Sequence, residues 1–100
     1  MLNINEAKME KHVKLDSDIH NYYEKLVREH ILELGLQNNK DENYISDIAC
    51  LALNQLPPRY IRYDVDMAFY LPDSERAQMR MNVINAVQLS VNFLEDQPKE

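Results

Sequence analysis

The chain has 100 residues, of which 45% are hydrophobic and 28% are charged, and its formal net charge is −6 at pH 7. This length suits one domain with one modest core. The negative charge disfavours broad contacts with a nucleic-acid backbone or an anionic lipid surface, so we expect neither direct DNA binding nor membrane association. The one cysteine, Cys50, excludes an intrachain disulfide framework and indicates a reducing, cytoplasmic location.

The fold class follows from the scarcity of glycine, which occurs once, at Gly35. All-β folds need many tight turns, and tight turns need glycine. We therefore predict a mainly α fold, a small bundle of three to four helices. Residues 1–16 are expected to form a polar arm or a short helix, residues 17–95 a single helical domain, and residues 96–100 a polar tail.

The first long helix is predicted to begin after Ser17 or Asp18, whose side-chain oxygen can accept hydrogen bonds from the free amides of the first turn. Gly35 ends it, because glycine adopts the left-handed conformation without a Cβ penalty. His20 and Glu24 have the i, i+4 spacing that metal ligands use. Two such residues are more typical of a solvated polar face, so we predict no metal site. The apolar face, with spacings of three and four residues, consists of Ile19, Tyr22, Tyr23, Leu26, Val27, His30, Ile31 and Leu34.

A second helix is predicted over about residues 44–56, after a polar loop over residues 37–43. It is apolar nearly all round, which is typical of a central, buried helix. Cys50 lies within it and is interpreted as a small buried apolar residue rather than a catalytic thiol. Pro57 and Pro58 end the helix, because proline lacks an amide donor and restricts the residue before it.

A third long helix is predicted after Pro72, with Asp73 or Ser74 as its N-cap. The preceding residues 59–71 are expected to begin extended and to continue as a short helix or strand. The wide apolar stripe of the third helix suits contact with a partner chain, and we expect a homodimer, although simple burial of the helix is the alternative. The main stripe is Ala77, Met81, Ile84, Val87, Val91 and Leu94, widened by Met79, Val83, Ala86 and Phe93.

Catalytic patterns are absent from the sequence. The serines stand at predicted caps or within helices, without a glycine-rich turn, and no pattern supplies a nucleophile, a base and a charge stabiliser together. Zinc, calcium and phosphate-loop motifs are also missing. We therefore predict that the chain is not an enzyme and that it has no catalytic residues and no cofactor.

The strongest candidate for binding is RYIRYD, residues 59–64, directly after the proline stop. If this stretch runs extended, its side chains alternate, and Tyr60, Arg62 and Asp64 face one way. An aromatic ring can stack on a base, a guanidinium can hold phosphate or the O6 and N7 of guanine, and a carboxylate can accept from a base amine. The alternative is that the tyrosines cover the edge of the core and the arginines form ordinary surface ion pairs.

A longer block, DIACLALNQLPPRYIRYD at residues 47–64, resembles the ComFB family, the late competence development proteins of bacteria. The shared signature is an apolar helix, LN, one residue, LPP, and then a tyrosine and an aliphatic residue, which here spans residues 53–61. The resemblance implies a small, largely helical dimer, and some family members are implied to be receptors for cyclic di-GMP and cyclic di-AMP. Some members carry a cysteine cluster ahead of this block that could bind zinc, but residues 41–46 here contain no cysteine.

The resemblance and the residue types together predict a non-catalytic receptor for a cyclic dinucleotide, with cyclic di-GMP favoured over cyclic di-AMP, that signals to a downstream protein partner. A two-fold dimer can supply the same residues to each half of a symmetric ligand, and an arginine fork can donate two hydrogen bonds to a phosphate. The alternative is a nucleotide-independent adaptor in competence or type IV pilus regulation. Asn54 is expected to cap the end of its helix. The candidate ligand-binding residues are Arg59, Tyr60, Arg62, Tyr63 and Asp64, together with Arg76 and Arg80 of the third helix.

Overall fold

The computed structural model describes residues 19–96, so the predicted arm over residues 1–16 and the caps at Ser17 and Asp18 lie outside the described residues. Four α-helices lie in the described part of the chain, which confirms the mainly α fold. None of them is long and apolar enough to cross a membrane. The elements in chain order are β1 (His20–Asn21), α3 (Tyr22–Leu34), a 3-10 turn (Leu36–Asn38), α4 (Glu42–Gln55), β2 (Tyr60–Ile61), α5 (Asp64–Tyr70) and α6 (Asp73–Glu95).

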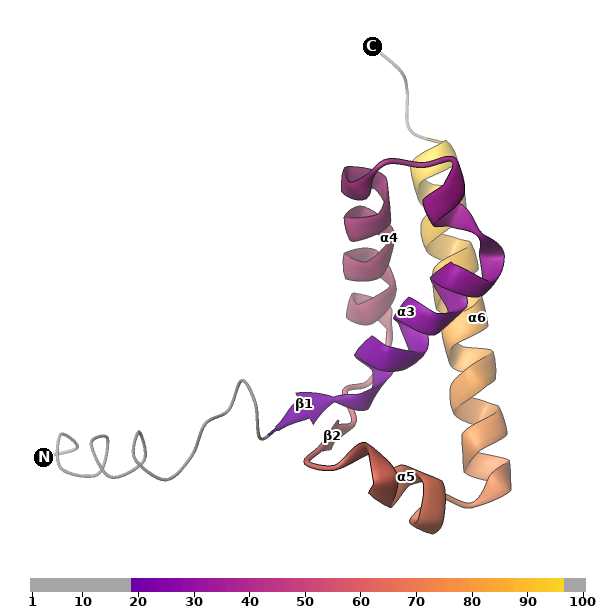
Figure 1. Ribbon diagram of the computed structural model, residues 1–100. Helices are drawn as coiled ribbons and strands as arrows, with labels where there is room; N and C mark the ends of the chain where they lie inside the picture. Colours follow the sequence, from indigo (N-terminus) through magenta and orange to yellow (C-terminus); the bar gives the residue numbers. More distant parts are fainter. Residues whose placement is uncertain (1–18, 97–100) are drawn as a thin grey trace, which may run out of the picture.

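Three helices, α3, α4 and α6, form the bundle, whereas α5 and the two short strands lie together at one end of it (Figure 1). Apolar side chains from all three helices meet in one core. Each fully buried aliphatic side chain of this kind contributes about 1.5–3 kcal/mol, so apolar burial holds the bundle together. The central residues are Val27 and Ile31 of α3, Ile48 and Ala52 of α4, and Val83 and Val87 of α6.

Helix α3 begins at Tyr22, later than the predicted start near residue 18. His20 and Asn21 form strand β1 instead and pair antiparallel with β2, His20 opposite Ile61 and Asn21 opposite Tyr60. The cap is Asn21, whose Oδ1 accepts a hydrogen bond from the amide of Tyr23 at 3.2 Å. His20 therefore does not share a helix with residue 24, and the predicted i, i+4 pair does not form.

The stop at Gly35 is confirmed, because its φ of 73° lies in the left-handed region and its amide bonds back to the last turn of α3. Helix α4 starts two residues earlier than predicted, with Asp41 as its cap. Its buried side carries Ile48 and Ala52, and Cys50 is exposed, so the prediction of a buried cysteine is wrong. The reason is geometric: residue 50 lies two positions, about 200° around the helix, from residue 48.

The apolar stripe of α6 is centred elsewhere than predicted. Ala77 and Met81, which open the predicted main stripe, are exposed. Residues on both sides of this helix are apolar, and the packing of α3 and α4 decides which side is buried. The helix also begins directly after Pro72, without a side-chain cap from residue 73 or 74. The buried residues are Met79, Val83, Ala86, Val87 and Ser90.

A polar link between α4 and α6 was missed by the sequence analysis. The Nε2 atom of Gln55 donates to the hydroxyl of Ser90 at 3.0 Å, and that hydroxyl donates to the carbonyl of Ala86 at 2.8 Å. Gln55 also donates to the carbonyl of Leu51 in its own helix. Asn54 instead contacts the sulfur of Cys50 at 3.7 Å, so the predicted backbone cap by Asn54 is wrong.

Candidate ligand-binding site

The backbone of Arg59 is fixed by two hydrogen bonds to the start of α3. Its amide donates to Oδ1 of Asn21 at 2.9 Å, and its carbonyl accepts from the amide of Tyr22 at 2.7 Å. Asn21 thus caps α3 and positions the segment after the proline stop with the same oxygen atom. Sequence reasoning did not identify Asn21, although asparagine is among the preferred cap residues.

The side chain of Arg59 forms an ion pair with Glu75 in the first turn of α6. Both side chains are 42% exposed, and a pair of this kind contributes no more than about 1 kcal/mol. A ligand phosphate can therefore compete with Glu75 for the guanidinium.

Arg62 lies over the ring of Tyr63, with Cζ 5.0 Å from the ring centroid. Among the described residues it makes no ion pair with a carboxylate. Tyr60 and Tyr63 beside it are 66% and 55% exposed. We call these three residues, Tyr60, Arg62 and Tyr63, the aromatic platform. It presents to solvent two exposed rings and a guanidinium that has no carboxylate partner.

Asp64 was predicted to face the same way as Tyr60 and Arg62 in an extended segment, but the segment is not extended as far as residue 64. Strand β2 ends at Ile61 and Asp64 opens α5, so the alternation expected over residues 59–64 does not continue to its end. The Oδ1 atom of Asp64 accepts a hydrogen bond from Nε2 of His20 at 2.8 Å, and Nζ of Lys25 lies 3.9 Å from Oδ2. The hydrogen bond from His20, followed by the charge of Lys25, lowers the pKa of Asp64.

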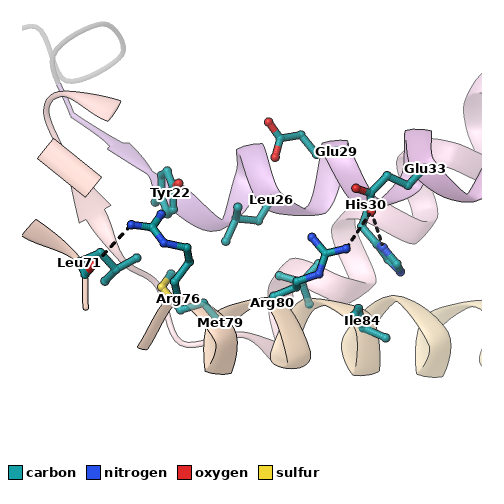
Figure 2. A pocket seen from close by; sticks show the side chains of 11 residues that line it. Tyr22, Leu26, Glu29, His30, Glu33, Leu71, Arg76, Met79, Arg80 and Ile84 are labelled. Carbon is teal, nitrogen blue, oxygen red and sulfur yellow. Dashed lines mark hydrogen bonds and ion pairs between the residues drawn. The ribbon is translucent and has the colours of Figure 1, made fainter. Parts of the chain in front are cut away.

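Arg76 holds helix α5 in place. Its Nη2 atom donates to the carbonyl of Met67 at 3.1 Å. The same atom donates to the carbonyl of Leu71 at 3.3 Å (Figure 2). These are carbonyls that the end of a short helix leaves without intrahelical partners. Arg80, one turn further along α6, lies 3.8 Å from Glu33 of α3, which also contacts His30 at 3.3 Å.

A groove of about 260 Å³ runs between α3 and α6 (Figure 2). Arg76 lines one end of it, and Arg80 lines the other with His30 and Glu33. None of residues 59–64 lines this groove, so the structure divides the candidate residues between the groove and the surface beside it. Its remaining lining residues are Tyr22, Leu26, Glu29, Leu71, Met79, Val83 and Ile84.

The described residues contain no group of three or more histidine, cysteine, aspartate and glutamate side chains that could hold a metal ion. The arrangement as a whole presents arginines and tyrosines near β2 and a mixed-charge groove beside them. Both features suit a ligand that has phosphates and aromatic bases.

Comparisons with known proteins agree with the signature after α4. No curated protein and no solved structure matches the chain significantly. The sequence model of one family, described as "Late competence development protein ComFB", matches residues 20–98. That range covers every helix and strand described above, and the chain therefore belongs to the ComFB family.

Proposed function

We propose that the chain is a non-catalytic receptor for a cyclic dinucleotide, with cyclic di-GMP favoured over cyclic di-AMP. The observation that carries the proposal is Arg62, which has no carboxylate partner among the described residues in a chain with 17 acidic and 11 basic residues. Arg59, by comparison, is occupied by Glu75. A guanidinium that contacts one exposed ring and has no carboxylate partner in an acidic protein is available for a phosphate.

The neighbouring tyrosines add the base contacts that such a ligand needs. A base stacked on an exposed ring such as that of Tyr60 gains about 1–3 kcal/mol. Asp64 can accept from a base amine, but it must then give up its hydrogen bond from His20. Ligand binding would thereby break the hydrogen bond between α5 and β1. The position of α5 on the protein surface would then depend on whether the ligand is bound.

A second copy of the chain is part of the proposal. The aromatic platform is open to solvent on one side, whereas ligand sites bury most of the ligand surface. Beside the aromatic platform, Phe69 and Tyr70 of α5 are 76% and 80% exposed. A two-fold partner would cover these rings and supply the same arginine and tyrosines to the second half of the ligand. In the cytoplasm, the resulting complex would signal to a protein partner.

Calorimetric titration of the protein with cyclic di-GMP and then cyclic di-AMP, with GTP as a control, tests this proposal. We expect saturable binding near one ligand per dimer, and Arg62→Ala should weaken it by about 1.5–3 kcal/mol, the usual worth of a hydrogen bond to a charged group. Arg59→Ala should weaken it less, because Arg59 must first leave Glu75. The control is Arg28→Ala, an exposed arginine of α3. Equal binding by the parent and Arg62→Ala would move the site elsewhere, and no binding of either dinucleotide would end the receptor proposal.

The exposed rings of α5 also favour a second candidate, a protein-interaction adaptor that ignores nucleotides and acts in competence or type IV pilus regulation. Large exposed apolar side chains that lie together often mark a protein interface. A partner that binds with the same affinity in the presence and absence of saturating cyclic dinucleotide, and that is lost in Phe69→Ser, would favour the adaptor. Nucleotide-dependent binding would favour the receptor.

A further inference from the structure

The groove between α3 and α6 has a charge pattern that does not suit phosphate alone. Arg76 and Arg80 line it, but so do Glu29 and Glu33, and a carboxylate repels a phosphate at short range. A ligand that fits must therefore present hydrogen-bond acceptors to one part of the groove and donors to another, with an apolar body between them.

Two of the polar groups are held in place and still have free bonding capacity. Arg76 uses only Nη2 for its bonds to the end of α5, and its Nε and Nη1 atoms make no hydrogen bond among the described residues. Glu33 uses Oε1 for its contacts with both His30 and Arg80, which leaves Oε2 without a partner in the same part of the chain. The groove thus offers a donor anchored on two backbone carbonyls at one end and a free carboxylate oxygen at the other.

We propose that this groove, rather than the ring of Tyr60, is the subsite for the guanine base in each half of the ligand, an inference that rests on the receptor function proposed above. Guanine presents the acceptors O6 and N7 on one edge and the amine N2 as a donor on another. Arg76 would donate to O6 and N7, and Oε2 of Glu33 would accept from N2. Leu26 from α3 lies between these two ends. Met79 from α6 lies on the opposite side of the groove, beside Arg76, and both side chains would contact the ring (Figure 2).

The size of the groove agrees with one base rather than a whole dinucleotide. Its volume of about 260 Å³ is below the range of roughly 300–1,000 Å³ that pockets for drug-sized ligands have. Tyr22 and Leu71 line the groove at the same end as Arg76 (Figure 2). The amide of Tyr22 bonds to the carbonyl of Arg59, and the Arg59 side chain pairs with Glu75, next to Arg76. The phosphates would therefore leave the groove toward Arg59.

The same geometry discriminates against adenine. Adenine carries the N6 amine, a donor, at the position where guanine carries the acceptor O6, and it has no amine at position 2. In the groove its amine would face the donors of Arg76, and Glu33 would lose its partner. Glu33 is therefore proposed as a residue that determines the preference for cyclic di-GMP.

The test is to titrate the parent protein, Glu33→Gln and the control Glu24→Gln with cyclic di-GMP and cyclic di-AMP. Glu24 lies on the same helix but outside this groove, so the control makes the same chemical change elsewhere. We expect the preference for cyclic di-GMP to fall about tenfold in Glu33→Gln, the lower end of what one specific base contact contributes. The preference should stay unchanged in Glu24→Gln.

The outcomes separate the subsite from the receptor. If the parent binds cyclic di-GMP and Glu33→Gln keeps the parental preference, or weakens both ligands equally, the guanine subsite is overturned and the receptor stands. If the parent binds neither dinucleotide, the receptor itself is overturned. A second readout needs no substitution at Glu33: the methyl resonance of Met79, assigned with Met79→Leu, should shift when cyclic di-GMP saturates the protein. An unshifted resonance at saturation would also overturn the subsite.

Discussion

The helical bundle and the segment over residues 59–71 are held by different forces. In the bundle, each of the three helices contributes an almost fully buried side chain to the shared core, namely Val27, Ile48 and Val87. The segment is tied down mainly by polar contacts near the surface, namely those of Asn21, Arg76 and Asp64 with their partners. Only two apolar anchors of this segment, Met67 and Leu71, are buried.

This contrast indicates which part of the protein a bound ligand can rearrange. Regions with few buried apolar contacts open at a lower cost than core helices, and polar surface contacts can be exchanged for contacts with a ligand. The bundle provides a rigid support, and the segment over residues 59–71 carries exposed arginine and tyrosine side chains that a ligand can reorder. The predictions below test this contrast, in order of decreasing effect.

The largest effect is expected in the bundle. Ile48→Ala should lower the free energy of unfolding by about 2–5 kcal/mol, because it leaves a cavity in a fully buried site. Urea denaturation followed by circular dichroism measures this. Leu89→Ala, at an exposed position of the bundle, should change stability by less than about 0.5 kcal/mol. Similar losses in both variants would contradict the assignment of the core.

A smaller effect is expected where the two regions meet. Asn21→Ala should cost about 1–2 kcal/mol, because it removes the cap of α3 and the acceptor for the amide of Arg59 together. The matched control is Asn43→Ala, an exposed change in the first turn of α4. Urea denaturation measures both variants. If Asn21→Ala lowers the free energy of unfolding no more than the control does, the Asn21 oxygen does not hold the segment over residues 59–71 to α3.

Arg76→Ala should act on α5 and spare the bundle. Loss of its two bonds to backbone carbonyls should favour local opening of α5 by about 1 kcal/mol. Hydrogen exchange should then become faster over residues 64–71 and remain unchanged around Ile48. Arg80→Ala, which breaks only an exposed ion pair, serves as the control. Uniform acceleration in all helices would contradict local control of α5.

The smallest effect concerns pH. The hydrogen bond from His20, and then Lys25, lowers the pKa of Asp64 in the folded state. A carboxyl whose pKa is lowered by folding stabilises the folded protein at pH values above its pKa in the unfolded chain, about 3.9. This contribution to the free energy of unfolding is lost as the pH falls through the pKa of the folded state. The parent should therefore be more stable than Asp64→Asn at pH 7, by less than about 1 kcal/mol because the pair is exposed. Urea denaturation of both proteins should give the same free energy of unfolding in acid. A difference between them that is the same at every pH would contradict the predicted effect of Asp64.

The sequence predicted the elements that local chemistry determines. Gly35 ends α3 as expected, the two prolines end α4, and Pro72 separates α5 from α6. These outcomes depend on backbone preferences that a residue keeps in any fold. The ComFB signature over residues 53–61, which begins in the last turn of α4, was recognisable because it is a contiguous run of residues.

The sequence could not reveal features that depend on distant contacts. Asn21 belongs to a strand because it meets Tyr60, which is far away in the chain. The buried stripe of α6 was misplaced because both sides of that helix are apolar and only packing distinguishes them. Glu33 and Arg76 line one groove although they belong to different helices. The candidate residues were chosen by type and position, and only the packing of α3 on α6 shows that Arg76 and Arg80 line the groove whereas residues 59–64 do not.

Hydrogen exchange of the protein with and without saturating cyclic di-GMP reports both whether the ligand binds and where it binds. The account predicts slower exchange over residues 59–71 and in the first turns of α6, with little change in α4, which supplies no proposed contact. Unchanged exchange throughout the chain, or protection confined to α4, would contradict the claim that this segment is where the protein binds its ligand.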